Sequence, residues 1–179
     1  MKQLALDIAP PAAPTLDNFV PGRNGELAAA LRSLAGGAGR ERFVYLWGSA
    51  GSGRTHLLRA VLEAARRGGR SATWFDPAQD TPADALVAAD DVDRLGAGAQ
   101  VALFNAHNRI RESSGALVAS GDAPPAQLKL RADLVTRLGA GLVYQVHALD
   151  RHALETKRAV TLPLARELLS AAPAAQHAD

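Results

Sequence analysis

A glycine-rich loop between an apolar strand and a helix constrains this chain more than any other feature. Residues 43–47 read FVYLW, and residues 48–55 read GSAGSGRT before an apolar, helix-forming stretch. This is the strand–loop–helix setting in which the pattern G-x-x-x-x-G-K-[ST] cradles phosphate. Glycines let backbone N–H groups converge on an anion, and the helix N-terminus adds the positive end of its dipole. The segment therefore predicts a nucleotide site.

One position of the loop departs from the pattern, because Arg54 stands where lysine is usual. A guanidinium is planar, always charged and bulkier than an ammonium, so it holds phosphate without acting as the same compact charge. We expect bound ADP or ATP with slow hydrolysis, and a Mg²⁺ ion held by the Thr55 hydroxyl. The alternative is a tight turn that packs without a ligand. The candidate nucleotide-binding residues of the loop are Gly48, Gly51, Ser52, Gly53, Arg54, Thr55 and His56.

The composition excludes several classes of protein. With 179 residues, 47% of them hydrophobic and 21% charged, the chain is long enough for one α/β core. The absence of cysteine excludes disulfides and thiolate metal sites, and the five histidines lack metal-ligand spacing. A net charge of +2 is too small to predict DNA binding from the overall field. No apolar run reaches membrane-spanning length, so we expect a cytoplasmic protein with no membrane partner.

Strand and helix patterns alternate along the chain. Several of the strands are continuous apolar runs, which is typical of a parallel sheet buried on both faces by helices. Asn24 is predicted to cap a helix at 25–35, and a helix is expected around Val101–Ile110. Ligands of such sheets bind beyond the carboxyl ends of the strands. The predicted strands are 43–47, 71–75, 85–89, 116–119 and 141–146.

Acidic residues follow two of these strands. Asp90 and Asp91 come directly after strand 85–89, where one carboxylate would hold Mg²⁺ and its neighbour would polarise an attacking water. The alternative is a pair of solvated acids. Asp122 follows strand 116–119 and could sense the γ-phosphate or the water, or simply form a turn before two prolines. Asp90, Asp91 and Asp122 are therefore candidate catalytic residues, and Asp90 is also a candidate metal ligand.

In this order the motifs resemble the AAA+ family, and within it the DnaA-type proteins, in particular regulatory inactivators of DnaA. The segment with Phe19 and Val20 resembles the part that packs around adenine. The loop at 48–55 resembles Walker A, Asp90–Asp91 resembles Walker B, and 117–122 resembles sensor 1. The stretch DLVTRL resembles the box VII segment, which implies that Arg137 acts as an arginine finger. Read alone, Arg137 is a surface arginine.

Two further features of the sequence bear on this resemblance. Gln3, Leu4 and Leu6 resemble the short motif that docks on the DNA polymerase sliding clamp, although four residues also match by chance. No helix-turn-helix domain follows the core, so we expect no direct sequence-specific DNA binding. The implied partners are the DnaA initiator and the sliding clamp, with a homo-oligomer left open.

The resulting organisation has three parts. We expect residues 1–14 to form a flexible tail with the clamp motif, 15–148 a P-loop AAA+ core with about five parallel strands, and 149–179 the remnant of a truncated helical lid and a disordered tail. The function implied is negative regulation of replication initiation, by stimulating hydrolysis of DnaA-bound ATP, with weak ATPase activity of its own. The alternatives are a self-sufficient P-loop ATPase of the DnaA or helicase-loader type, and a scaffold that binds partners without nucleotide.

Overall fold

The computed structural model describes residues 15–16 and 22–147. The expectations for Gln3, Leu4 and Leu6, for Phe19 and Val20, and for the lid at 149–179 lie outside the described residues. Within them, three short 3-10 turns accompany four α-helices and five strands. In chain order these are η1 (Gly22–Asn24), α1 (Gly25–Gly36), β1 (Phe43–Trp47), α2 (Arg54–Arg67), β2 (Ala72–Trp74), β3 (Leu86–Ala89), η2 (Val92–Arg94), α3 (Ala97–Arg111), β4 (Ala116–Gly121), η3 (Pro125–Gln127), α4 (Ala132–Gly139) and β5 (Leu142–Gln145).

The sequence predicts a parallel sheet of about five strands, and this is confirmed. The structure gives the strand order, which is β2-β3-β4-β1-β5. Val44 of β1 lies opposite Val118 of β4 on one side and Leu142 of β5 on the other. Because all strands point the same way, the segments that follow β1, β3 and β4 emerge at one edge of the sheet. This edge carries the glycine-rich loop, Asp90 and Asp122.

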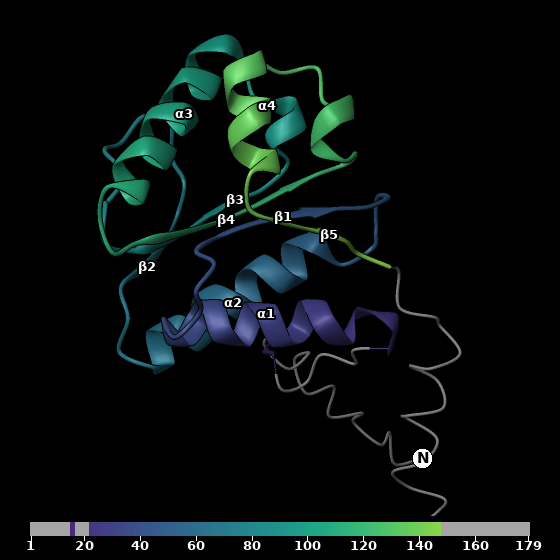
Figure 1. Ribbon diagram of the computed structural model, residues 1–179, viewed down its shortest axis with the longest axis vertical. Coiled ribbons are helices and arrows are strands. Elements are labelled where there is room, and N and C mark those ends of the chain that lie inside the picture. The colour runs from purple at the N-terminus through teal and green to yellow at the C-terminus, as the bar shows by residue number, and fades with distance from the viewer. Residues whose placement is uncertain (1–14, 17–21, 148–179) are drawn as a thin grey trace, which may run out of the picture.

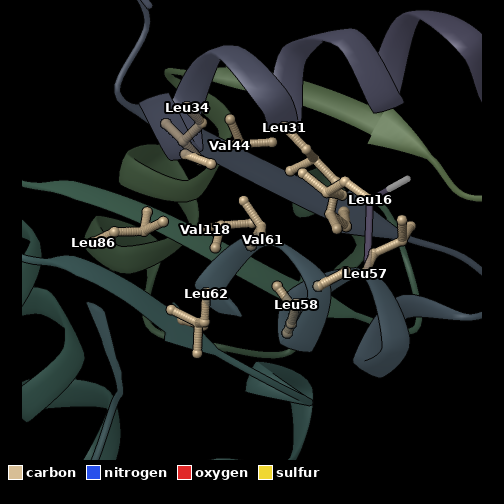
Figure 2. Packing of buried hydrophobic residues seen from close by; sticks show 14 of the residues in the cluster. Leu16, Leu31, Leu34, Val44, Leu57, Leu58, Val61, Leu62, Leu86 and Val118 are labelled. Atoms are coloured by element: carbon tan, nitrogen blue, oxygen red, sulfur yellow. The ribbon is translucent and has the colours of Figure 1, made fainter. Parts of the chain in front are cut away.

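Helices α1 and α2 cover one face of the sheet and α3 and α4 cover the other (Figure 1). Side chains of β3 and β4 are buried on both faces, which explains why these strands read as continuous apolar runs. Figure 2 shows the cluster on the α1–α2 side, where Leu31 and Leu34 of α1 meet Val61 of α2 and Val44 and Val118 of the sheet. The helix after the loop thus presents its apolar side to the core, and this packing fixes the direction in which its first turn points.

The opposite cluster joins Tyr45, Val87 and Leu117 of the sheet to the helices of that face, including Leu103 of α3 and Leu134 of α4. The predicted apolar face of α3 is only partly correct. Val101 is exposed, whereas His107, which was not predicted to face the core, is buried. A period-based prediction cannot tell which side of an alanine-rich helix turns inward when apolar residues occur on both. No helix in the described part of the chain is long and apolar enough to cross a membrane.

The predicted role of Asn24 is corrected by the structure. Asn24 stands at the N-cap position of α1, but its side chain makes no capping hydrogen bond. Its Oδ1 instead accepts the backbone N–H of His147, and its Nδ2 donates to the carbonyl oxygen of His147. Asn24 is buried, and the backbone just beyond edge strand β5 needs partners, so the carboxamide satisfies that backbone rather than the helix. The other end of α1 follows the sequence, since Gly37 adopts the left-handed conformation there.

Candidate nucleotide-binding site

The glycine-rich loop leaves the end of β1 and turns sharply into α2. Gly53 stands at the N-cap of α2 with φ of 100°, a left-handed value that side chains rarely adopt. Gly48 is required for a different reason, because a Cβ there would lie 2.7 Å from the carbonyl oxygen of Val146. Arg54 and Thr55 therefore occupy the first turn of α2, where free N–H groups and the helix dipole favour an anion.

Two polar atoms of the loop are buried without a hydrogen-bond partner among the described residues: Ser52 Oγ and Arg54 Nη1. A buried polar group that lacks a partner costs free energy, so such atoms at a loop of this shape indicate a ligand that accepts hydrogen bonds. A phosphate group is such an acceptor, and it also matches the charge of Arg54. The residues present therefore fit the phosphate of a nucleotide.

The two predicted Mg²⁺ ligands lie together although they are 35 positions apart. Thr55 Oγ1 donates a hydrogen bond to Asp90 Oδ2 over 2.6 Å. The other carboxylate oxygen of Asp90 accepts from the Ser120 hydroxyl and from the backbone N–H of Asp91. A hydroxyl beside one carboxylate is a donor set that suits Mg²⁺, which keeps several waters and takes its other ligands from phosphate.

Ser120 lies in the segment 117–122 that the sequence places at this edge, but no role in the site was predicted for it. The predicted strand ended at Ala119, but β4 continues to Gly121, and this extension places Ser120 opposite Leu46 in the middle of the sheet. Ser120 is fully buried, and the hydrogen bond from its hydroxyl orients the Asp90 carboxylate. A serine at the carboxyl end of an apolar strand is the signal that could have indicated it.

Asp91 has a contact that the sequence did not suggest. Its Oδ1 lies 3.4 Å from Arg54 Nη2, and its Oδ2 lies 3.8 Å from Arg94 Nη1. The backbone of Asp91 has φ of 45° and ψ of 48°, and Asp91 is the one non-glycine residue with positive φ in the described ranges. The carboxylate expected to act on water is thus paired with the cation expected to hold phosphate.

The loop that carries Asp122 is held by two further residues that were not anticipated, Asp93 and Tyr45. Asp93 Oδ1 accepts the backbone N–H of Asp122 over 3.1 Å, and the Tyr45 hydroxyl donates to the carbonyl oxygen of Ala123 over 2.9 Å. Burial raises the pKa of Tyr45, and the charge of Asp93 adds to the effect. The side chain of Asp122 is exposed at the same edge of the sheet as Asp90.

Comparison with known proteins fits this geometry. A sequence profile of the AAA ATPase domain matches residues 20–177. The chain belongs to the AAA ATPase domain family. AMPPCP-bound DnaA from Aquifex aeolicus has a similar fold, with a TM-score of 0.68, 20% identity, and coverage of 86% of this chain and 56% of that chain. For domain III of Thermotoga maritima DnaA the TM-score is 0.70, the identity 23%, and the coverage 87% and 75%.

A further structure with this fold is that of the DnaC helicase loader, with a TM-score of 0.54, 18% identity, and coverage of 74% of this chain and 96% of that chain. The AAA ATPase domain described here therefore shares the DnaA-like arrangement of a five-stranded parallel sheet with flanking helices. The chain spans 52% to 56% of the length of the first DnaA and replication initiation factor chains that it matches.

Two of the predicted site residues, His56 and Arg137, are not among the side chains that meet at the glycine-rich loop of this AAA ATPase domain. His56 lies in the first turn of α2 but is exposed, and its pKa is lowered by partial burial and by Arg59. Arg137 lies in the last turn of α4, just before β5 begins, and its Cζ is 5.8 Å from the centre of the Phe104 ring. The ring of His107 is buried between this region and Phe43, at a centroid distance of 4.2 Å from Phe43.

The backbone that follows Arg137 leads to the end of the sheet opposite to the loop, because β5 begins at Leu142, which lies opposite Val44 near the start of β1. Phe43 is the first residue of β1, and the glycine-rich loop begins only after Trp47, its last residue. The length of β1, at about 3.3 Å per residue, therefore lies between the start of β5 and the loop. Burial, followed by the positive charges of Arg137 and Arg111, lowers the pKa of His107 to about 4.

Proposed function

We propose that this AAA ATPase domain is a nucleotide-bound regulator that inactivates DnaA, similar to Hda, and that it acts on its partner's ATP through Arg137. The observation that supports the proposal is the position of Arg137 in the last turn of α4, beside Phe104 and just before β5, whose first residue lies opposite Val44 near the start of β1. An arginine there would not serve the phosphate bound by its own loop. It can serve a nucleotide held by a neighbouring subunit.

The chain's own nucleotide, ADP or ATP, supplies a phosphate charge that Ser52, Arg54 and the first turn of α2 bind. Thr55 and Asp90 would hold Mg²⁺ beside it, with Ser120 keeping the Asp90 carboxylate in place. The expected adenine contacts of Phe19 and Val20 belong to the same proposal. Bound nucleotide would stabilise the edge of the sheet from which the segments after β1, β3 and β4 emerge. The ligand is then a structural support rather than a substrate that turns over.

Arg137 would place its guanidinium near the γ-phosphate of DnaA-bound ATP. A finger of this kind stabilises the charge that develops on the transferred phosphoryl group, and it accelerates hydrolysis by about 10³ to 10⁵ in other NTPases. The Phe104 ring under the guanidinium limits the orientations of a long side chain, so less entropy is lost when the arginine meets phosphate. Hydrolysis converts the partner to its ADP form and ends initiation.

The decisive experiment measures hydrolysis of ATP bound to DnaA, with this protein, sliding clamp and DNA present. Arg137→Ala should abolish the stimulation, and Arg137→Lys should fail to restore it because an ammonium lacks the planar fork. Arg131→Ala is the matched control, since Arg131 lies at the start of the same helix and pairs with Asp133. Full stimulation by Arg137→Ala would eliminate the finger.

A second candidate function is a self-sufficient ATPase of the DnaA or helicase-loader type. It is favoured by the intact arrangement of Thr55, Asp90 and Ser120, with Asp91 and Asp122 at the same edge of the sheet. In that case the purified chain alone would turn over ATP steadily, and Asp90→Asn would stop it. Slow hydrolysis that does not respond to Asp90→Asn would remove this candidate.

A further inference from the structure

The guanidinium of Arg54 already has an anionic partner at the phosphate-binding loop. Arg54 Nη2 lies 3.4 Å from Asp91 Oδ1, and the side chain of Arg54 is only 11% exposed. Its Nη1 is buried and has no partner in the described part of the chain. The cation is therefore half satisfied: one terminal nitrogen faces a carboxylate, and the other lacks an acceptor within the described ranges.

The backbone around Asp91 directs its carboxylate toward Arg54. Asp91 is held in the left-handed region, which costs a non-glycine residue about 1–3 kcal/mol and persists only where neighbouring contacts impose it. Here the backbone N–H of Asp91 donates to Asp90 Oδ1 at 3.1 Å and approaches Ser120 Oγ at 3.4 Å. The conformation that anchors Asp91 to the metal-site carboxylate also brings its side chain to Arg54.

A second cation is available to Asp91 in solvent. Arg94 Nη1 lies 3.8 Å from Asp91 Oδ2, and the side chain of Arg94 is 78% exposed. If another anion takes the place of Asp91 at Arg54, the Asp91 carboxylate therefore keeps a partner without being buried alone. Asp91 stands between a nearly buried arginine and an exposed one.

We propose that Asp91 is an exchangeable counter-ion of Arg54: nucleotide phosphate displaces the Asp91 carboxylate from Arg54, and Asp91 then keeps Arg94 as its cationic partner. This inference rests on the proposed function of the loop as a nucleotide site. It assigns Asp91 a role in binding, by competition for the same guanidinium, in place of the role of a base that acts on water. No bond is made or broken in the exchange.

The exchange predicts two effects of opposite sign from one substitution. Without nucleotide, Asp91→Asn removes the charge that compensates a nearly buried guanidinium, so the protein should lose stability. With nucleotide, the same substitution removes the competitor of phosphate, so affinity should rise. A purely structural residue would lower both stability and affinity, and a catalytic base would leave affinity unchanged.

The experiment compares wild type with Asp91→Asn by thermal unfolding without nucleotide and by calorimetric titration with ADP and Mg²⁺. We expect a Tm about 2–4 °C lower for the variant without nucleotide. We expect the Kd for ADP to be about threefold to tenfold lower for the variant. Asp91→Glu keeps the charge and should restore the wild-type behaviour in both measurements.

Asp80→Asn provides the matched control, because Asp80 pairs with Arg109 over 3.0 Å on the surface and is 97% exposed. It should change neither the Kd for ADP nor, appreciably, the Tm. An Asp91→Asn protein with unchanged or weaker ADP binding would overturn the inference while leaving the nucleotide site itself in place. Wild-type protein that binds no ADP would overturn the proposed function together with the inference.

Discussion

Asn24 and His147, 123 positions apart, are joined by two hydrogen bonds between one buried carboxamide and the backbone N–H and carbonyl oxygen of a single residue. Asn24 Nδ2 donates to the His147 carbonyl oxygen over 3.0 Å, and Asn24 Oδ1 accepts the His147 N–H over 2.9 Å. His147 follows Val146, whose N–H continues the pairing with Trp47 at the start of the glycine-rich loop. The beginning of α1, the end of β5 and the phosphate-binding loop therefore meet at one junction.

Replacing Asn24 with aspartate should destabilise the domain. The carboxylate still accepts from the His147 N–H, but it cannot donate to the carbonyl oxygen and repels it. Because the group is buried, we expect a loss of about 1–3 kcal/mol in the free energy of unfolding, measured with urea. The same substitution at exposed Asn105 of α3 should cost under about 0.5 kcal/mol. Equal effects at both positions would show that the junction contributes nothing.

The stability effects of substitutions at Gly121 and at Tyr45 should depend on each other. A Cβ at position 121 would meet the Tyr45 hydroxyl, which is fixed by its hydrogen bond to Ala123. Gly121→Ala should therefore cost about 1–3 kcal/mol through overpacking. Tyr45→Phe alone should cost about 1 kcal/mol for the lost hydrogen bond.

In the double variant the hydroxyl is gone, so the cost should be smaller than the sum of the two single costs. Urea unfolding of all four proteins gives the coupling energy directly. Strict additivity would mean that the added methyl group is accommodated elsewhere.

Buried His107 should make the protein less stable in weak acid. Its pKa is lowered to about 4 by burial first and then by Arg137 and Arg111, whereas an unfolded histidine titrates near 6.5. The unfolded state therefore binds the proton first, and the contribution of His107 is fully present above about pH 6.5 and is lost as the pH falls toward 4.

His107→Phe removes the titrating group and should flatten the dependence of unfolding free energy on pH between about 6.5 and 4. His56→Phe is the matched control, because His56 is exposed and should leave most of the slope intact. A slope that survives in His107→Phe would assign the acid sensitivity to other groups.

Thr55 and Asp90 should together be responsible for the Mg²⁺ dependence of nucleotide binding. Thr55→Val removes the hydroxyl without changing the side-chain shape, so ADP affinity should become independent of Mg²⁺. Ser120→Ala should reduce the dependence partly, because Asp90 keeps its hydrogen bonds with Thr55 and with the Asp91 backbone. Titrations with ADP in Mg²⁺ and in EDTA measure both. A Thr55→Val protein with undiminished Mg²⁺ dependence would contradict the assignment.

The N-terminal motif should account for binding to the sliding clamp. Gln3→Ala combined with Leu4→Ala should abolish retention of the clamp in a pull-down, since glutamine would supply hydrogen bonds and the leucine an apolar anchor. Lys2→Ala is the control in the same tail. Retention of the clamp by the double variant would mean that its binding site, if any, lies elsewhere.

Sequence reasoning was most successful where a local signal coincides with a buried strand. The limits of β1 are those predicted, and the glycine-rich loop leads into α2 as its pattern indicated. The meeting of Thr55 with Asp90 also followed from sequence, because parallel strands bring their carboxyl ends to one edge. Expectations failed where the partner of a side chain is distant: Asn24 has the residue type of a cap, but tertiary contact with His147 outweighs the local hydrogen bond.

The amino-acid sequence by itself determined the alternation of strands and helices and the position of the phosphate-binding loop. Both depend on local properties, namely the spacing of apolar residues and the backbone conformations open to glycine. Only the tertiary structure decided that Arg54 pairs with Asp91, that Ser120 and Asp93 support the acidic residues, and that Arg137 lies beside the Phe104 ring. These relationships depend on which strands become neighbours and where each helix ends. Long-range packing sets both, and no short segment of the chain encodes them alone.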